Sequence, residues 1–478
     1  MALTGRLELL TKTQLEQVHE ASLKILKETG VYFNCSEAVD LFKVHGFRVD
    51  GKNVFFTDNN ITEALKTCPS LYDFRARNPK MSMQHGIGQK NKLLVSACYG
   101  SPFVSENGVE RNGTARDYID FTKLVQACDA VTFAGGILTE PVDIPAGIRE
   151  LIMFYYSLKH SDKLLLGFSG TKNKLAHIFK MAQIAFEQGE ELWNDCIMAV
   201  PVCPTSPLKY EVTACESLLE FAKKGQPVYI VNCLMAGVTS PISILGTAVQ
   251  QNCEFLAGLV LAQLVKPGTP VVYVPGSTTA NMRMVCYANG SPEANMCNLV
   301  GLQLAYYYNL PNRVMSGITD SKVVDYQAGM ETMQNHLLLT AAGAQCLHNG
   351  VGTLNSLISM SFPKFVLDAE CVDRINIIAA GIPFGEEELA VGDIMEVGAH
   401  GSHLMSDSTL DHYDCRWEAS LSCSGPYSQW EEQGSKDASQ RAQIYAGQLI
   451  GSQPAEGLLP ELVDLKLKNY LESISGTA

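Results

Sequence analysis

The sequence predicts an α/β protein built on a (β/α)8 TIM barrel, with an N-terminal α/β cap and a C-terminal helical extension. Eight short apolar runs alternate with helical segments at intervals of roughly 30–45 residues, which is the repeat of this barrel. The runs are apolar throughout, as expected for parallel strands that are buried on both faces. Glycine with proline at 266–270, and asparagine with proline at 309–311, mark places where a helix ends and a strand begins.

The predicted barrel occupies residues 91–376. Its expected strands are residues 93–99, 131–138, 163–168, 197–202, 228–234, 271–274, 313–316 and 345–348. Residues 1–90 are the expected cap, with a helix at 12–30, strands at 47–49 and 54–56, and a short helix at 61–65. Residues 377–478 are expected to pack on the barrel, with helices at 386–397, 436–449 and 461–473.

The composition narrows the class of protein. The chain has 478 residues, of which 46% are hydrophobic, so it can bury a large core. A net charge of -14 argues against nucleic acid and anionic membranes as partners. We find no signal-peptide pattern and no apolar run of membrane-spanning length, so we expect a cytoplasmic protein without a membrane partner. The 15 cysteines contain no CxxC pair, so we expect reduced core thiols rather than disulfides.

Residues 310–329 are a candidate functional site. A short strand at 313–316 leads into a polar loop at 317–325, and a helix is expected to begin near Tyr326. In a β/α barrel, the loops at the carboxyl ends of the strands carry the chemistry. The glycine-rich segments match neither a dinucleotide fingerprint nor a P-loop, and no GxSxG nucleophile motif occurs.

This loop resembles one in a known enzyme family. Residues 317–322 read Gly-Ile-Thr-Asp-Ser-Lys. They resemble the Gly-pyrrolysine-Ser-Asp-Ala-Lys loop of the trimethylamine methyltransferase family of corrinoid-dependent enzymes, with Ile318 in the place of pyrrolysine. Further segments resemble family patterns in the same order along the chain, and they lie at 203–208, 276–279, 290–293, 325–329 and 434–437. The ordered set spans most of the chain.

The resemblance implies a reaction. A methyl group would move from a quaternary amine, such as glycine betaine, proline betaine or carnitine, to the Co(I) corrinoid of a separate corrinoid protein. The cofactor, cob(I)alamin or methylcobalamin, would belong to that partner. A quaternary ammonium leaves as a neutral tertiary amine without protonation, so Ile318 suffices where trimethylamine needs pyrrolysine. The family resemblance also implies a homo-oligomer.

Arg313, at the start of the seventh strand, is the main candidate for substrate recognition. A guanidinium matches a carboxylate in two parallel hydrogen bonds, which suits a betaine. In the family's trimethylamine enzymes an aromatic residue occupies this place. The alternative is a structural arginine that is paired with an acidic residue of a neighbouring strand.

Aromatic residues at strand ends can hold a quaternary ammonium by cation–π attraction. Tyr99, Tyr326 and Phe133 are the candidates, with plain packing as the alternative for each. Ile318 and Asn349 are further candidate substrate contacts.

His348 and Asp320 are the candidate catalytic residues. His348 ends the eighth strand, where it could bond the substrate carboxylate or face the corrinoid. Asp320 could alternatively order its loop through local backbone bonds or pair with Lys322.

The corrinoid itself is expected to contact residues of two loops. These are Ser277, Thr278, Gly317 and Thr319.

Two other functions remain open from the sequence. One is a zinc-dependent corrinoid methyltransferase for an alcohol or thiol, with a site formed by Cys98, Cys203, Cys233, Cys346 and His348. None of these residues is paired at ligand spacing, and a quaternary ammonium offers no lone pair to a metal, so we expect no metal. The other is a protein that binds a betaine without turnover.

Overall fold

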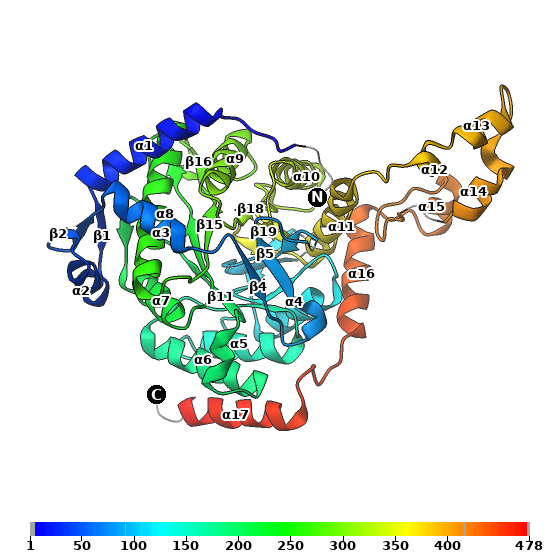
Figure 1. Ribbon diagram of the computed structural model, residues 1–478. Coiled ribbons are helices and arrows are strands. Elements are labelled where there is room, and N and C mark those ends of the chain that lie inside the picture. The colour runs from blue at the N-terminus through cyan, green and yellow to red at the C-terminus, as the bar shows by residue number, and fades with distance from the viewer. Residues whose placement is uncertain (1–4, 91, 107, 415–416, 476–478) are drawn as a thin grey trace.

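The structure is a computed structural model that describes residues 5–90, 92–106, 108–414 and 417–475. Its centre is a barrel of parallel strands (Figure 1). The barrel strands are β6 (Leu94–Val95), β9 (Phe133–Gly135), β10 (Leu164–Leu166), β11 (Met198–Val202), β13 (Val228–Asn232), β15 (Val271–Pro275), β18 (Val314–Met315) and β19 (Cys346–His348). All eight lie within the runs predicted from the sequence or extend them by one residue.

The strands form a closed ring. Two hydrogen-bonded sets, β15-β13-β11-β10-β9 and β18-β19-β6, follow the chain order. Parallel bridges join the sets, one between Ser96 and Phe133 and one between Tyr273 and Asn312. The ring thereby confirms the predicted (β/α)8 barrel. The first strand is much shorter than predicted, because the chain leaves the ring after Ser96.

A helix follows each barrel strand and covers the outside of the ring (Figure 1). These helices are α4 (Ala115–Ala127), α5 (Arg149–His160), α6 (Lys172–Phe186), α7 (Val212–Lys223), α8 (Ile244–Val265), α9 (Pro292–Tyr307), α10 (Tyr326–Ala341) and α11 (Phe362–Ala380). Helix α8 is buried on nearly all sides because α1 and α3 of the N-terminal region pack on its outer face. This double burial explains why its sequence is apolar all round.

The N-terminal region combines helices with a small sheet. Its elements are α1 (Lys12–Glu28), β1 (Val31–Phe33), α2 (Ser36–Val44), β2 (Arg48–Asp50), β3 (Asn53–Phe55), α3 (Asp58–Thr67), β4 (Leu71–Phe74), η1 (Pro79–Met81) and β5 (Met83–Gly86). The sheet order is β12-β1-β3-β2, and β12 (Lys209–Tyr210) comes from a barrel loop. The first helix ends two residues earlier than predicted, because Gly30 takes a left-handed φ of 72° and turns the chain into β1.

The β4–β5 hairpin closes the amino-terminal end of the barrel. Phe74 packs against Phe133 inside the ring, with ring centroids 5.5 Å apart. The Tyr72 hydroxyl lies 2.9 Å from Nδ1 of His85, whose Nε2 lies 2.9 Å from the carbonyl oxygen of Asn312. Because this end is filled, a ligand can enter the barrel interior only from the carboxyl-terminal face.

His85 should make the protein less stable in acid. Burial, with a smaller contribution from the Arg313 charge, lowers the pKa of His85 to about 4. The unfolded chain binds this proton near pH 6.5 and the folded chain near pH 4, so stability falls as the pH drops between these values. The loss amounts to roughly 3 kcal/mol by pH 4. Denaturant unfolding at several pH values gives the free energy of unfolding at each pH. This free energy should fall less steeply with decreasing pH in His85→Gln than in the original protein. Equal slopes would contradict the assignment.

The remaining short strands lie in the loops at the carboxyl-terminal face. One sheet has the order β20-β21-β7-β8 and another has the order β14-β16-β17. The strands are β7 (Phe103–Glu106), β8 (Val109–Asn112), β14 (Met235–Ala236), β16 (Thr278–Asn281), β17 (Cys286–Tyr287), β20 (Thr353–Leu354) and β21 (Ser359–Met360). The 3-10 turn η2 (Glu190–Asn194) lies between α6 and β11.

The C-terminal region has two parts. Helix α16 (Ala438–Ser452) packs on α11 and α4, and α17 (Glu461–Ser475) packs on α6 and α5. Between α11 and α16 the chain projects away from the barrel (Figure 1). This segment contains α12 (Glu386–Leu389), α13 (Val391–Val397), η3 (His403–Met405), α14 (Asp407–His412) and α15 (Tyr427–Glu432). Among the described residues, no helix is long and apolar enough to cross a membrane.

Candidate active site

Arg313 lies inside the barrel and is fully buried. Its backbone precedes β18, but its guanidinium reaches the carboxyl ends of β6 and β19. The Nη2 group donates to the Ser96 hydroxyl oxygen and to Nδ1 of His348, both at 2.6 Å. The guanidinium carbon lies 5.0 Å from the centre of the Tyr229 ring, which supports the cation from one side.

The guanidinium keeps unused donors. Nε and Nη1 of Arg313 are buried without a hydrogen-bond partner, and Nδ2 of the adjacent loop residue Asn349 is in the same state. In the described part of the chain, Arg313 forms no ion pair with an acidic residue, so the structural alternative raised by the sequence finds no partner there. A buried cation without an anion is costly, which suggests that the anion is supplied by a ligand.

The contact with Arg313 sets the state of His348. Because Arg313 donates to Nδ1, the proton of the neutral imidazole must lie on Nε2. Burial first, and then the Arg313 charge, holds the pKa of His348 well below its usual value. His348 is therefore neutral near pH 7, and it is a hydrogen-bond donor at Nε2 rather than an acid.

Cys203 directly follows β11 at the mouth of the barrel. Its side chain is accessible to solvent, yet burial raises the pKa of its thiol to about 11, while the Arg313 charge lowers it. The charge of Cys203 in turn acts on the pKa values of Tyr99 and Tyr287, after the larger effect of burial. Arg313, Tyr99 and Tyr287 therefore lie near Cys203, and the space at the barrel mouth between these four residues is called the recess below.

Tyr99 is held firmly at the rim of this recess. Its backbone N–H donates to Oδ1 of Asn349 at 2.8 Å, and its hydroxyl donates to the carbonyl oxygen of Gly167 at 3.4 Å. Its ring lies on Gly136, where a Cβ would come within 2.5 Å of the ring. The tight packing fixes the ring plane, and burial raises the pKa of the phenol, so the ring stays neutral.

The β16–β17 hairpin brings Tyr287 to the recess. The Tyr287 hydroxyl donates to the carbonyl oxygen of Cys233 at 3.0 Å, after β13, and its own carbonyl oxygen accepts from Ser356 at 3.4 Å, after β19. The hairpin therefore bridges two sides of the barrel mouth. Burial raises the pKa of Tyr287 to about 12, and Cys233 and Cys203 add to the rise.

Three other predicted substrate contacts differ in position. Ile318 is 2% exposed and belongs to the apolar cluster inside the barrel. Phe133 lies deeper, against Phe74 of the plugging hairpin, so it packs the base rather than caging a ligand. Tyr326 begins α10 and is 84% exposed, apart from the recess, because the loop before it turns outward.

Asp320 links two loops in the structure, and its catalytic role stays a prediction. Its carboxylate accepts from the backbone N–H groups of Asn289 and Gly290, both at 3.1 Å, and from the Ser356 hydroxyl at 2.5 Å. Lys322 donates to the backbone carbonyl oxygen of Asp320, not to its carboxylate. The alternative that Asp320 orders its own loop through local backbone bonds was wrong, because the backbone N–H groups that it binds belong to another loop, 30 and 31 residues away.

The four residues predicted to contact the corrinoid are all engaged within the protein. Ser277 donates to Gln251 at 2.6 Å, and Thr278 donates to the carbonyl oxygen of Ala288 at 2.9 Å. Thr319 is buried and donates to Glu331 at 2.6 Å. At Gly317 a Cβ would lie 2.5 Å from the carbonyl oxygen of Asn349, so this glycine permits two loops to touch. These residues shape the mouth, because their polar groups are needed to join its loops.

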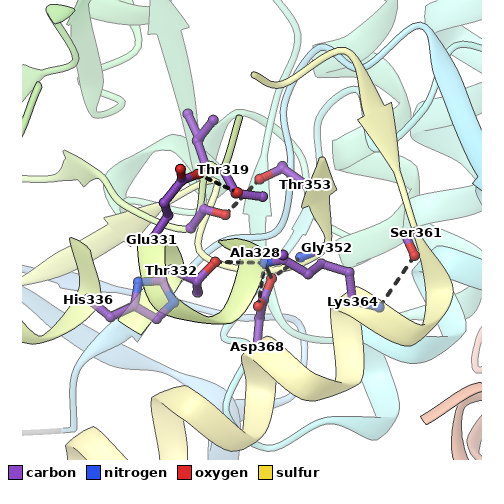
Figure 2. A network of polar contacts seen from close by, with 12 residues as sticks. Thr319, Ala328, Glu331, Thr332, His336, Gly352, Thr353, Ser361, Lys364 and Asp368 are labelled. Atoms are coloured by element: carbon purple, nitrogen blue, oxygen red, sulfur yellow. Dashed lines mark hydrogen bonds and ion pairs between the residues drawn. The ribbon is translucent and has the colours of Figure 1, made fainter. Parts of the chain in front are cut away.

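A polar network beneath the loop supports it (Figure 2). Glu331 of α10 accepts from Thr319, from the backbone of Asp320 at 2.8 Å and from Gln327 at 2.9 Å. A second group joins α11 to the loop after β19, through Lys364 and Asp368 (Figure 2). The loop geometry is thus determined by side chains of two helices.

No group of three or more His, Cys, Asp or Glu residues that could hold a metal ion occurs in the described ranges. Burial also raises the pKa values of the Cys98 and Cys346 thiols to about 12, so these side chains remain protonated.

Several site residues escaped the sequence analysis. They are Ser96, Tyr229 and Tyr287, while Cys203 entered the sequence analysis only as a possible zinc ligand. Ser96 and Cys203 directly follow barrel strands, so the strand-end rule contained a usable signal for them. Tyr287 lies in a hairpin whose position over the mouth has no signature in the sequence.

Comparisons with known proteins give a consistent result. The sequence model described as trimethylamine methyltransferase matches residues 2–474. The chain is 33% identical over 471 residues to the glycine betaine methyltransferase of Desulfitobacterium hafniense (strain Y51), covering 98% of this chain and 97% of that protein. It is 30% identical over 422 residues to the proline betaine:corrinoid methyltransferase of Eubacterium limosum, covering 85% of each. The crystal structure of monomethylamine methyltransferase from Methanosarcina barkeri shares the fold, with a TM-score of 0.54 and 12% identity over 96% of this chain and 91% of that one.

Proposed function

Because the chain belongs to the trimethylamine methyltransferase family, we propose that it moves a methyl group from a betaine to the Co(I) corrinoid of a separate corrinoid protein. The observation that carries the choice of a betaine is Arg313, a buried guanidinium without an ion pair among the described residues and with unused N–H groups.

Arg313 would bind the substrate carboxylate. Its Nε and Nη1 groups have donors to spare, while Ser96 and His348 hold the Nη2 side of the guanidinium in place. The Tyr229 ring packs on one face of the guanidinium and prevents it from moving in that direction. A charge-assisted hydrogen bond in this dry interior is stronger than one at the surface, so the carboxylate supplies much of the binding free energy.

Tyr99 and Tyr287 would hold the ammonium end. A quaternary ammonium has no N–H group, so it is recognised through aromatic faces, at about 0.5–2 kcal/mol for each ring. Both phenols remain neutral because burial raises their pKa values. The two ends of the substrate would then lie on opposite sides of the recess beside Cys203, which fixes the direction of the N-methyl bond.

The protein itself has little bond chemistry to perform. When the partner is bound, its Co(I) corrinoid supplies the nucleophile. The leaving group is a neutral tertiary amine, so no side chain has to donate a proton, which agrees with the neutral state of His348. The tasks of the chain are to align the substrate, to exclude water and to balance charge.

The corrinoid protein would dock over the barrel mouth. Exposed apolar side chains surround this face on the loops after β13, β15 and β18, and they include Ile242, Met284, Val285 and Val323. Large exposed apolar side chains that gather on the loops of one face support a protein interface there. It also suits the broad apolar faces of a corrin ring.

Turnover is tested by mixing the purified protein with a betaine and either the reduced corrinoid protein or free reduced cobalamin. The substrates are glycine betaine, proline betaine, carnitine and butyrobetaine, with trimethylamine and methanol as comparisons. We expect the visible absorbance of the corrinoid to change with at least one betaine and not with trimethylamine. Betaine binding by calorimetry without any absorbance change would instead identify a binding protein. Activity on methanol that depends on added zinc would identify the zinc enzyme.

Ile318 should be chemically inert. The change Ile318→Val removes one methyl group from a side chain that is 2% exposed and contacts the apolar interior. We expect a loss of stability of roughly 0.5–1.5 kcal/mol and nearly unchanged turnover. Steady-state kinetics and thermal unfolding measure both quantities. Loss of all methyl transfer by a folded variant would assign Ile318 a direct role.

We also propose that the protein forms a homo-oligomer, supported by the exposed C-terminal segment discussed next. The cytoplasmic location predicted from the sequence stays a prediction.

A further inference from the structure

Residues 382–414 form an arm that leaves the end of α11 and stands away from the barrel (Figure 1). None of these 33 residues is buried. Large apolar side chains are 72–90% exposed along it, namely Ile382, Phe384, Met395, Leu404, Met405 and Tyr413. Isolated helices of four to seven residues are unstable in water, so these short helices need a surface to pack on. An exposed apolar area of this extent marks a binding surface.

The arm also carries most of the net charge of the chain. It contains eight Asp and Glu residues and no Lys or Arg, against a total net charge of -14. The rest of the chain carries a net charge of only -6 over a much longer stretch, so negative charge is concentrated in the arm. Two arms of the same charge repel each other, so the arm should pack on a body surface that offers cations rather than on another arm.

Such a surface lies beside the root of the arm. A hollow of about 680 Å³ opens on the amino-terminal face of the barrel, and its lining includes Arg6, Lys90, Lys92 and Tyr306. Glu8 also lines it and pairs with Arg6 at 3.8 Å, so Lys90 and Lys92 give the hollow its positive charge. Ala379 and Ala380, the last residues of α11, form another part of the wall. The exposed Ile377 and Ile378 extend the apolar strip from this wall into the arm.

We propose that the arm docks on this basal hollow of a second copy of the chain. The acidic, apolar arm starts next to the cationic hollow of its own chain. In a dimer with two-fold symmetry, the arm of each copy can therefore pack in the hollow of the other copy. The arm leaves α11 at the end of the barrel opposite the mouth, since Leu93 and Gln345, which precede barrel strands, line the same hollow. The corrinoid protein has to approach the mouth, so it is not the occupant of this face.

The arm can be removed without disturbing its anchor. Trp417 lies under Arg374 of α11 at 4.7 Å, and Glu370 accepts from the backbone of Leu421 at 2.6 Å, so the returning chain is held on the barrel beyond the arm. We therefore replace residues 382–416 with a short Gly-Ser linker. Light scattering should give about twice the chain mass of 52.1 kDa for the original protein and a monomer for the linker variant. The melting temperature of the linker variant at high dilution should match that of the original.

A smaller change tests the apolar contact. The double substitution Ile382→Ser and Phe384→Ser should raise the dissociation constant of the assembly at least tenfold in sedimentation velocity. The control is Val44→Ser, which removes an apolar side chain that is 82% exposed on α2 of the N-terminal cap and should leave the constant unchanged.

The charge contact is tested separately. Lys90→Glu should weaken the assembly, and adding E386K, E387K and E388K to that variant should restore it. A monomeric original protein, or a linker variant that assembles as well as the original, would overturn the proposal. Both results are independent of methyl transfer, so they leave the proposed activity untouched.

Discussion

Replacing Arg313 by alanine should raise the KM for a betaine by a factor of about 30 or more, with a much smaller effect on substrates that lack a carboxylate. Removal of a buried charge partner costs roughly 2–5 kcal/mol in binding. A factor of 30 corresponds to the lower end of that range, at about 1.4 kcal/mol for each factor of ten. The measurement is a pair of steady-state series, one with glycine betaine and one with choline or tetramethylammonium.

Two further variants separate charge from shape. Arg313→Met keeps most of the volume without the charge, so it should behave like the alanine variant toward betaines. Arg313→Lys keeps the charge but loses the planar group that contacts Ser96 and His348 together. We expect the lysine variant to lie between the original protein and the methionine variant. Equal losses on betaines and on choline would show that Arg313 supports the barrel rather than recognising the carboxylate.

The second large effect concerns stability. Changing Asp368 to alanine should lower the free energy of unfolding by about 3–5 kcal/mol, because it leaves the Lys364 ammonium buried without its anion. Lys364 Nζ lies 2.5 Å and 2.6 Å from the two carboxylate oxygens, and the two side chains are 2% and 3% exposed (Figure 2). The same carboxylate accepts the backbone N–H of Gly352 at 2.8 Å, which would also lose its partner.

Two controls accompany this variant. The double change Lys364→Met and Asp368→Leu removes both charges and should recover most of the lost stability. Glu63→Ala removes one member of the exposed pair with Lys66, whose side chains are 59% and 65% exposed, and should cost well under 1 kcal/mol. Denaturant midpoints measure all four proteins. A cost below 1 kcal/mol for Asp368→Ala would show that water reaches Lys364.

This ion pair also connects the fold to the site. Asp368 fixes Gly352, and the next residue, Thr353, donates to the carbonyl oxygen of Gly317 at 2.8 Å. Gly317 begins the loop that carries Ile318 and Thr319. The Asp368 variant should therefore lose turnover at temperatures where it is still folded, because the loops around the recess lose their common support.

The sequence alone determined the barrel. Parallel strands that are buried on both faces must be apolar throughout, and the helices between them must end in residues that stop a helix, so strand number and order can be read from local patterns. The sequence placed His348 and Tyr99 at the carboxyl ends of strands and Arg313 at the start of one, and the structure brings all three to the recess or its wall. Helix α8 shows the limit of periodicity, because its cover by the N-terminal region removes the amphipathic pattern.

The tertiary structure alone decided what the polar residues do. A loop aspartate or threonine has the same local sequence whether it meets a ligand or a backbone N–H group of a neighbouring loop. The structure shows hydrogen bonds within the protein for Asp320, Ser277, Thr278 and Thr319, which their local sequence could not reveal. Conversely, Nε and Nη1 of Arg313 have no hydrogen-bond partner among the described residues. The sequence could not predict this, because the groups around the guanidinium come from strands that are far apart in the chain. Which donors are satisfied depends on contacts between distant segments, and these contacts exist only once the barrel has closed.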